Sequence, residues 1–293
     1  MSTVVRAAAG EGPCGSRARP SPALEVCPVV SNTRLAPATY RLRFFSPSIS
    51  RSAIPGRFLH IDCRALPGAR RPILRRPFSV SDADAGLGWA DVVYRVVGPG
   101  TEWLSSVGPG ESVDVLGPLG NGFSLPRRRG AVLIVSGGIG IAPLLGWARR
   151  LTGAGHRVHA LVGARTRDSL VGLDYLSSAG AATTACTDDG SVGFKGTVCE
   201  LLHPVLRRVA PIQVYACGPS PVLRAVQSAA LALDIPCEIS VEDRIACGIG
   251  ACVGCAVPKR HPSAGSAYFR ACADGPVFNA ADVAIQGDEV TPS

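Results

Sequence analysis

The chain has 293 residues, of which 46% are hydrophobic and 18% charged, and its mean hydropathy is +0.24. This length fits two medium domains better than one, and the composition excludes a disordered polyelectrolyte. The net charge is +8, but the basic residues occur in short pairs and triples without interleaved aromatic residues, which argues against nucleic-acid binding.

Residues 1–22 are rich in Ala, Gly, Arg, Ser and Pro and contain no apolar run long enough for a signal peptide. We expect them to form a disordered extension. The apolar stretch Ala131–Ala148 is interrupted in its middle by Gly137, Gly138, Gly140 and Pro143, which would break a membrane-spanning helix. The sequence therefore predicts no membrane segment and a cytoplasmic location, where clustered cysteines more often bind metal than form disulfides.

Short alternating segments separated by Pro and Gly turns occupy residues 23–126, which predicts an antiparallel β-barrel or sandwich. The segments are Tyr40–Phe45, Arg57–Asp62, Asp91–Val97 and Ser112–Leu116. Within this region Arg76-Pro77-Phe78-Ser79 and Gly100-Thr101 offer a guanidinium and hydroxyls, groups that suit a diphosphate. On spacing alone, a surface arginine beside a turn explains these residues as well.

Apolar strands alternate with helical stretches over residues 127–241, which predicts a doubly wound, parallel α/β sheet. Its expected strands are Ala131–Ser136, Arg157–Val162, Ala182–Thr187, Ile212–Ala216 and Cys237–Val241, with helices after Pro143 and over Val222–Leu233. Residues 242–293, where Gly and Cys dominate, are expected to form a small lobe without an apolar core of its own.

Two turns of the expected sheet carry signals for a nicotinamide nucleotide. Gly138, Gly140 and Pro143 follow the first strand directly, and glycines at such a turn let a pyrophosphate approach the backbone. Cys217-Gly218-Pro219 ends a later strand at the same carboxyl edge, where ligands of such sheets bind. A tight turn and a buried cysteine remain the alternative interpretation.

The strongest local signal is the set Cys247, Cys252, Cys255 and Cys272, whose first two intervals match the C-x4-C-x2-C spacing of plant-type 2Fe–2S sites. Glycines between these cysteines let the backbone curl and point N–H groups at the sulfurs. A structural zinc site usually has two CxxC pairs, whereas this stretch has one. The spacing therefore favours a 2Fe–2S cluster, with zinc and unligated cysteines as alternatives.

In this order the motifs resemble the ferredoxin reductase superfamily and, within it, the electron-transfer subunits of class 1B dihydroorotate dehydrogenase. The matching segments are Arg75–Ser79, Gly117–Phe123, Gly137–Pro143, Thr187–Ser191, Cys217–Pro219, Cys247–Cys255 and Cys272–Phe278. The resemblance covers about residues 22 to 285, and nothing from it applies to Cys14.

The resemblance implies FAD in the barrel, NAD(H) on the parallel sheet and a 2Fe–2S cluster in the C-terminal lobe. By that likeness FAD would be lined by Arg76, Pro77, Phe78, Ser79, Val93, Tyr94, Arg95, Gly100 and Thr101. The nicotinamide nucleotide would meet Gly138, Gly140, Pro143, Cys217, Gly218 and Pro219. The cluster would be held by Cys247, Cys252, Cys255 and Cys272, beneath an apolar cover of Ile245, Ile249 and Val253.

The implied activity is electron transfer from an FMN-containing dihydroorotate dehydrogenase catalytic subunit through the cluster and FAD to NAD+, in pyrimidine biosynthesis. Such a path needs no acid–base triad, so no catalytic side chain is expected. The family implies a heterotetramer of two subunits of each kind.

Two alternatives to this function stay open: a reductase subunit that links NAD(P)H to ferredoxin, polysulfide or a hydrogenase, and a metal-stapled scaffold without cofactors. A question about the nucleotide remains as well. Arg165 and Arg167 could favour the extra phosphate of NADP, whereas the resemblance points to NAD.

Overall fold

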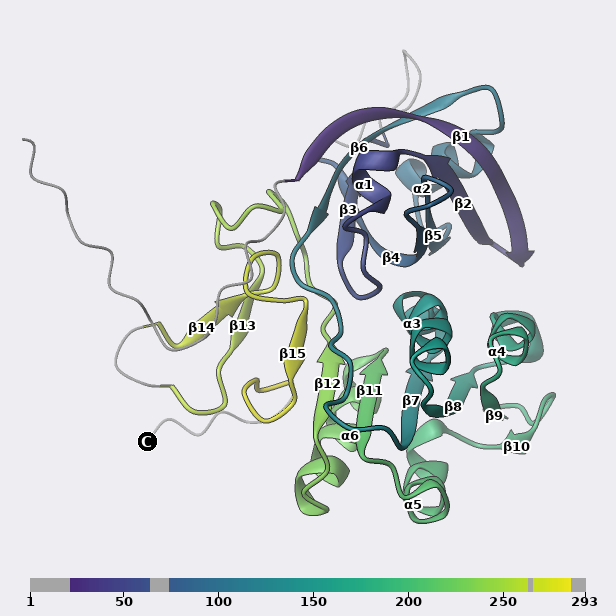
Figure 1. Cartoon of the computed structure of the whole chain (residues 1–293), viewed down its shortest axis with the longest axis vertical. Helices are drawn as coiled ribbons and strands as arrows, with labels where there is room; N and C mark the ends of the chain where they lie inside the picture. Colours follow the sequence, from purple (N-terminus) through teal and green to yellow (C-terminus); the bar gives the residue numbers. More distant parts are fainter. Residues whose placement is uncertain (1–21, 64–73, 263–265, 286–293) are drawn as a thin grey trace, which may run out of the picture.

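The computed structural model describes residues 22–63, 74–262 and 266–285 (Figure 1). Residues 1–21, which make up nearly all of the expected extension, lie outside the described residues. The described chain folds into a closed barrel, a seven-stranded sheet with helices on both faces, and a small C-terminal lobe. This arrangement confirms the expected fold class.

The barrel has six antiparallel strands in the spatial order β1-β2-β5-β4-β3-β6, and β6 pairs with β1 to close it. Inward-facing residues such as Leu42, Phe44 and Val92 are fully buried and alternate with more accessible neighbours, as expected for a barrel of this size. The elements are β1 (Ala23–Ala36), β2 (Thr39–Phe45), α1 (Pro47–Ser50), β3 (Phe58–Ile61), β4 (Arg76–Asp84), β5 (Trp89–Arg95), α2 (Pro99–Ser106) and β6 (Ser112–Leu119).

The second sheet has the spatial order β10-β9-β8-β7-β11-β12-β15 and is parallel except for its edge strand β15. The chain runs outward from β7 to β9 and then returns to β11 on the other side of β7. Its elements are β7 (Ala131–Gly137), η1 (Gly138–Ile141), α3 (Ala142–Gly153), β8 (Arg157–Ala164), η2 (Arg167–Ser169), α4 (Leu173–Ser178), β9 (Ala182–Thr187), β10 (Phe194–Lys195), α5 (Val198–Val209), β11 (Gln213–Cys217), α6 (Ser220–Ala232) and β12 (Cys237–Ser240).

Helices cover both faces of this sheet: α3 and α4 lie on the side of the barrel, and α5 and α6 lie on the opposite side (Figure 1). Because successive strand residues point to opposite faces, the continuous apolar run of β7 fills two cores. Val132 and Ile134 belong to the core under α3, whereas Leu133 and Val135 belong to the core under α5 and α6. The run Ala131–Ala148, which could be mistaken for a membrane segment, is thus the buried strand β7 followed by the η1 turn and the first part of α3.

The C-terminal lobe completes the sheet instead of standing apart from it. Its strands are β13 (Ala256–Pro258), β14 (Tyr268–Arg270) and β15 (Val277–Asn279). Strand β15 pairs antiparallel with β12, and lobe residues such as Val257 and Phe278 share one core with α6. We propose domain boundaries near residues 126 and 241, with the lobe 242–293 depending on the sheet for its core.

Helix α3 packs closely against strand β4 and thereby holds the barrel on the sheet. Asp82 of β4, only 3% exposed, accepts hydrogen bonds from Arg149 Nε at 3.0 Å and Arg149 Nη2 at 2.6 Å, and one from the Tyr175 hydroxyl of α4. Gly146 allows this approach, since a Cβ there would lie 2.6 Å from Asp82 Oδ1. The contact joins one barrel strand to two helices of the sheet.

Two glycines of α3 give a matched test of that contact. Gly146→Ala should lower the free energy of unfolding by about 1–3 kcal/mol, because the added methyl group overlaps backbone that cannot move away. Gly153→Ala, near the exposed end of the same helix and with no atom within 4 Å of the added Cβ, should instead be neutral or stabilising by about 0.5–1 kcal/mol. Urea unfolding of both variants measures the difference, and equal effects would contradict the close contact.

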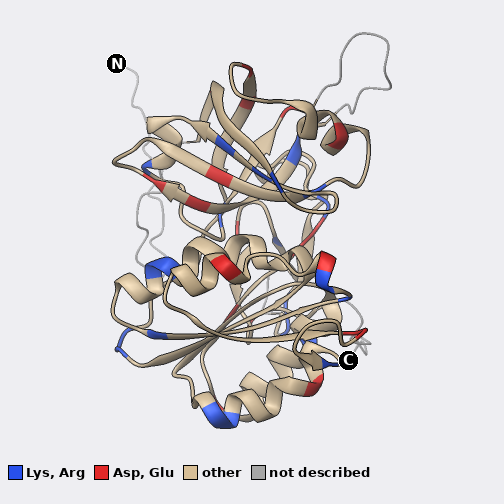
Figure 2. Cartoon of the chain, turned by 90° about the vertical axis from the view of Figure 1, so that its right-hand side faces the viewer, with Lys and Arg blue, Asp and Glu red and all other residues tan. Residues whose placement is uncertain are grey.

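Charged residues are mixed over the face drawn in Figure 2, where basic and acidic side chains occur on both the barrel and the sheet without a continuous basic stripe. Among the helices of the described residues, none combines the length and the apolarity that crossing a bilayer requires.

Candidate functional site

A cavity of about 360 Å³ lies between the barrel and the carboxyl edge of the sheet. Strands β4 and β5 and helix α2 form its barrel side, and α3 together with the segment after β12 forms the opposite side. It brings together most of the residues expected to bind FAD, together with one expected to meet the nucleotide: Arg76, Pro77, Phe78, Ser79, Val93, Tyr94, Arg95, Thr101 and Pro143. A cavity of this kind, apolar with a few polar groups, suits a flat aromatic cofactor.

Aromatic rings form part of the wall of this cavity. Phe78 and Tyr94 meet edge to face with ring centroids 5.7 Å apart, and Tyr94 stacks on Tyr40 at 5.8 Å. The Tyr94 hydroxyl donates to Asn32 Oδ1 at 3.1 Å, and burial raises the pKa of Tyr94 to about 12. The tyrosine therefore stays neutral and presents its ring, and Phe78 offers the cavity no hydroxyl.

Helix α2 begins beside the cavity, and its first turn differs from the sequence-based expectation. The Thr101 hydroxyl accepts from the N–H of Val97 at 2.9 Å and of Gly98 at 3.2 Å, and donates to the Gly98 carbonyl at 3.0 Å. Its proton closes the helix turn and is not left free for a diphosphate. Gly100 does not line the cavity. The first turn of α2 can therefore offer an anion only its backbone N–H groups.

The two glycine turns of the sheet meet backbone to backbone. A Cβ on Gly140 would overlap the Cys217 carbonyl and lie 2.6 Å from Gly218 Cα, and Gly218 itself has φ +155°. These turns follow β7 and β11, the neighbouring strands at which the strand order reverses, and ligands of such sheets bind there. Gly138 has φ +56°, and no atom lies within 4 Å of the point that a Cβ would occupy there, so its backbone stays open to an approaching ligand.

Cys217 ends β11, as the sequence predicted, but its side chain does not line either cavity. Its side chain is 2% exposed and belongs to the core under α3, and burial raises its pKa. Only its backbone takes part in the turn. Gly218 and Pro219 instead line a second, smaller cavity.

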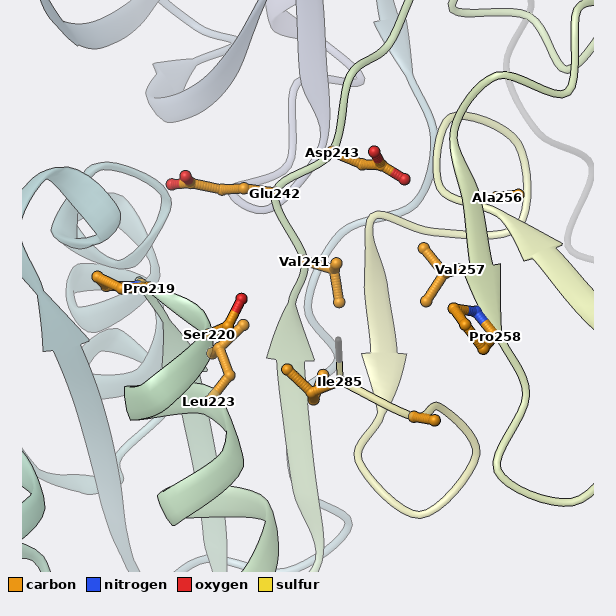
Figure 3. A pocket seen from close by; sticks show the side chains of 12 residues that line it. Pro219, Ser220, Leu223, Val241, Glu242, Asp243, Ala256, Val257, Pro258 and Ile285 are labelled. Atoms are coloured by element: carbon orange, nitrogen blue, oxygen red, sulfur yellow. The ribbon is translucent and has the colours of Figure 1, made fainter. Parts of the chain in front are cut away.

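This small cavity, of about 210 Å³, lies between the start of α6 and the C-terminal lobe (Figure 3). Glu242 and Asp243, which follow β12, line both the small and the large cavity. Sequence reasoning missed these two acids, although their place directly after a strand at the carboxyl edge was a usable signal.

Cys247, Cys252 and Cys255 lie on the loop before β13, Cys272 lies in the turn directly after β14, and the four are arranged in two pairs. The N–H of Cys252 points at Cys247 Sγ at 3.4 Å, and the N–H of Cys272 points at Cys255 Sγ at 3.4 Å. The N–H of Gly250 donates to Cys272 Sγ at 3.1 Å, and both Gly248 and Gly250 have positive φ. The backbone thus curls around the sulfurs as the glycines predicted.

The pKa values of Cys247, from the first pair, and Cys272, from the second pair, are shifted in opposite directions. At Cys247 burial favours the thiol, but N–H groups of Cys252, Ile249 and Ala251 outweigh it and lower its pKa to about 6. Burial and the neighbouring Cys255 raise the pKa of Cys272 to about 12. Cys247 is therefore largely a thiolate at neutral pH, the form that binds metal.

The cysteine geometry also bears on the zinc alternative. In the parts of the chain that the structure describes, no three His, Cys, Asp or Glu side chains surround one point that a single ion could occupy. Each iron of a 2Fe–2S cluster takes two cysteine thiolates, so two separate pairs fit such a cluster better than a mononuclear zinc site.

The cysteine loop lies close to the large cavity. A Cβ on Gly248 would lie 2.8 Å from His60 Cε1, and the His60 ring meets Phe58 at 5.5 Å between centroids. Phe58 lines the cavity. His60 is 1% exposed and burial lowers its pKa to about 4, so it is a neutral packing residue between the loop and the cavity.

The expected apolar cover over the cysteines is only partly present. Ile245 is half-buried and lines the large cavity. Ile249 and Val253, however, are 62% and 56% exposed, so the expectation that they shield the cysteines within this chain was wrong. They form an exposed apolar surface beside Cys247 and Cys252.

Comparisons with known proteins agree with this site. Residues 242–284 match the model of the iron–sulfur cluster binding domain of dihydroorotate dehydrogenase B. The chain is 40% identical over 246 residues to the electron transfer subunit of dihydroorotate dehydrogenase B (NAD(+)) of Desulforamulus reducens, covering 83% of this chain and 92% of the relative. The subunit of the same name from Bacillus caldolyticus is 37% identical over 259 residues, covering 88% and 97%.

Solved structures show the same architecture. An NADH-dependent reduced ferredoxin–NADP oxidoreductase, described in the context of flavin-based electron bifurcation, matches with TM-score 0.77 and 30% identity over 89% of this chain and 90% of that one. A cytochrome P450 reductase from Amycolatopsis matches with TM-score 0.57 and 20% identity over 72% and 66%, which bears on the fold alone.

Proposed function

The chain belongs to the family of electron transfer subunits of NAD(+)-linked dihydroorotate dehydrogenase B, and we propose that its cysteine loop, large cavity and glycine turns form one electron path in that order. It is an oxidoreductase subunit with a 2Fe–2S cluster, FAD and NAD as its redox groups. The observation that supports the proposed order is the packing of Gly248 on His60 and of His60 on Phe58, so that only these two side chains lie between the cysteine loop and the cavity along this contact.

We assign the cluster to Cys247, Cys252, Cys255 and Cys272. The FAD ring is assigned to the wall formed by Phe78 and Tyr94, with Arg76 and the first turn of α2 as partners for its diphosphate. FAD, when bound, exchanges single electrons with such a cluster and a hydride with NAD(H). The chain's own residues orient these groups, and the hydride transfer itself needs no acid–base side chain.

The nicotinamide nucleotide is assigned to Gly138, Gly140 and Pro143 on one turn and to Gly218 and Pro219 on the other. The surroundings of Arg167 support NAD. Its guanidinium donates to the Ser191 carbonyl at 2.8 Å and its N–H donates to the Ser191 hydroxyl, beside Asp189. An arginine bound in this way next to an acidic residue is poorly placed to take up an additional phosphate.

The family name implies a catalytic partner subunit, and the exposed pair Ile249 and Val253 supports a docking surface at the cysteine loop. An apolar patch beside exposed Cys252 would let a partner shield the cluster and shorten the distance that an electron crosses. We propose an FMN-containing partner, two copies of each subunit, and a cytoplasmic complex.

The test is dihydroorotate-dependent formation of NADH, followed by absorbance. The catalytic subunit of the same organism is compared alone and co-purified with this chain, with NAD+ and then NADP+. Activity with NAD+ in the complex alone is the expected result. The protein could instead be coloured and reducible by NADH, yet form no NADH from dihydroorotate when combined with the catalytic subunit. That result would favour a reductase with another partner, in line with the likeness to the ferredoxin–NADP oxidoreductase.

A further inference from the structure

Reduction of NAD+ at the large cavity needs a proton that the electron path does not deliver. This inference rests on the proposed function. Each NAD+ that becomes NADH takes up two electrons and one proton. Electrons that arrive through an iron–sulfur cluster bring no proton with them. One proton per NADH must therefore enter the large cavity by a separate route.

Few side chains of the cavity can supply that proton. The guanidinium groups of Arg76 and Arg95 do not release protons in proteins. The Tyr94 hydroxyl donates to Asn32, and burial raises its pKa to about 12. The hydroxyls of Ser79, Thr101 and Ser240, which also line the cavity, are too weakly acidic to be net proton donors. Among the described residues that line the cavity, this leaves the carboxyl groups of Glu242 and Asp243.

The two carboxyl groups differ in what they contact. Asp243 Oδ1 accepts a hydrogen bond from the Arg244 N–H at 2.6 Å. Figure 3 shows the Asp243 side chain pointing toward the lobe, while Glu242 points the opposite way, toward the nucleotide-binding side of the sheet. Within the described part of the chain, Glu242 has no hydrogen-bond or ion-pair partner, so its carboxyl is free to exchange a proton.

Glu242 is exposed overall, so its carboxyl can exchange a proton with solvent. Desolvation by the protein atoms around it raises its pKa above the ordinary value of a glutamate, and no charged neighbour contributes to the shift. The ionisable groups that line the same cavities are Arg76, Tyr94 and Arg95 across the large cavity and Asp243 beside it; the small cavity adds none among the described residues.

We propose that Glu242 is a proton relay for the large cavity. Its carboxyl gives one proton into that cavity for each pair of electrons that arrives there, and regains a proton from solvent through the small cavity that it also lines. The proton leaves with the two electrons as the hydride of NADH, so that NAD+, two electrons and one proton give NADH. In the reverse direction the carboxylate takes the proton back.

The first experiment uses reduced methyl viologen, a one-electron donor that carries no proton, to drive NAD+ reduction by the chain loaded with FAD and cluster. Glu242→Gln should slow this reaction about a hundredfold, the usual effect of removing a positioned proton donor. Reduction of bound FAD by NADH should keep its rate, because the hydride brings its own proton. Asp243→Asn, the matched comparison on the same segment, should slow the viologen-driven reaction less than Glu242→Gln does, because the Asp243 side chain points toward the lobe.

Two further measurements separate a relay from a structural role. The wild-type viologen rate should fall as the pH rises through the pKa of Glu242, since only the protonated carboxyl can donate, and Glu242→Gln should lose that fall. In the apoprotein, the carbon-13 signal of the Glu242 carboxyl, assigned with the variant, should titrate above the reference pKa of about 4.3.

The relay would be overturned if Glu242→Gln reduced NAD+ with viologen at the wild-type rate and with the wild-type pH profile. It would also be overturned if only Asp243→Asn lost that activity. Because this assay contains no dihydroorotate and no partner, failure of the wild-type complex to make NADH from dihydroorotate would contradict the proposed function alone.

Discussion

Replacing Cys252 with serine should abolish electron transfer from the partner subunit to NAD+ while leaving FAD reducible by NADH. Serine oxygen is a poor ligand for iron, and changes around the metal ligands alone commonly cost 10–100-fold, so dihydroorotate-driven NADH formation should fall about a hundredfold or more. Cys252 is exposed and does not line the large cavity, so the flavin half of the path should survive. Visible absorption of the cluster and stopped-flow reduction of the flavin by NADH measure the two halves separately.

Cys199 provides the matched control. It is a partly exposed cysteine on α5, outside the cysteine loop, and Cys199→Ser should leave both the cluster absorption and NADH formation unchanged. A Cys252→Ser protein that still holds FAD but no longer reacts with NADH would show that the electron path does not run in the proposed order. Full coupled activity in the same variant would show that Cys252 is not a ligand.

The cysteine set could be predicted from sequence because its chemistry is local. Spacing and intervening glycines fix how a short loop curls around sulfur, and the structure gives Gly248 and Gly250 the positive φ that this needs. The strands of the sheet could be predicted equally well, since apolar runs buried on both faces give a strong sequence signal. The expected strand Ala131–Ser136 corresponds to β7 with one residue added.

Other features depend on contacts that no local pattern records. Strand β4 begins at Arg76-Pro77, residues typical of a turn, and is a strand because β3 and β5 pair with it on either side. Strand β1 places Leu24 and Val26 on its outer face, 63% and 71% exposed, so its alternation gave no clear inward side. The role expected for the Thr101 hydroxyl failed for a related reason, because capping its own helix satisfies it first.

The site at Glu242 depended mainly on the tertiary structure. A glutamate directly after a strand at the carboxyl edge of a sheet is a weak sequence signal on its own. What distinguishes Glu242 is that two cavities, formed by segments far apart in the chain, meet at its side chain. Ile249 and Val253 illustrate the converse: apolar residues near a metal site suggested a cover, yet both side chains are more than half exposed.

Gly140→Ala should impair NADH binding, at the other end of the electron path from the step that Cys252→Ser interrupts. The added methyl group would overlap the Cys217 carbonyl and the backbone of Gly218, and neither can shift without disturbing the pairing of β11 with β7. The two turns should move apart and lose the backbone surface assigned to the pyrophosphate. We expect NADH to bind at least about tenfold more weakly, a loss of about 1.4 kcal/mol, and its reduction of FAD to slow accordingly.

Cluster binding and one-electron transfer should remain intact in Gly140→Ala. The hydrogen bonds to the cysteine sulfurs do not involve this turn, and Gly140 does not line the large cavity. Cluster absorption and one-electron reduction by methyl viologen should therefore match the wild type, while NADH titration shows the weakened site. Gly153→Ala, a glycine of the neighbouring helix with open space at its Cβ, is the control and should bind NADH normally. Unchanged NADH affinity in Gly140→Ala would mean that the nucleotide uses another part of the sheet edge, whereas loss of both halves at once would mean that the turns support the fold and not the site.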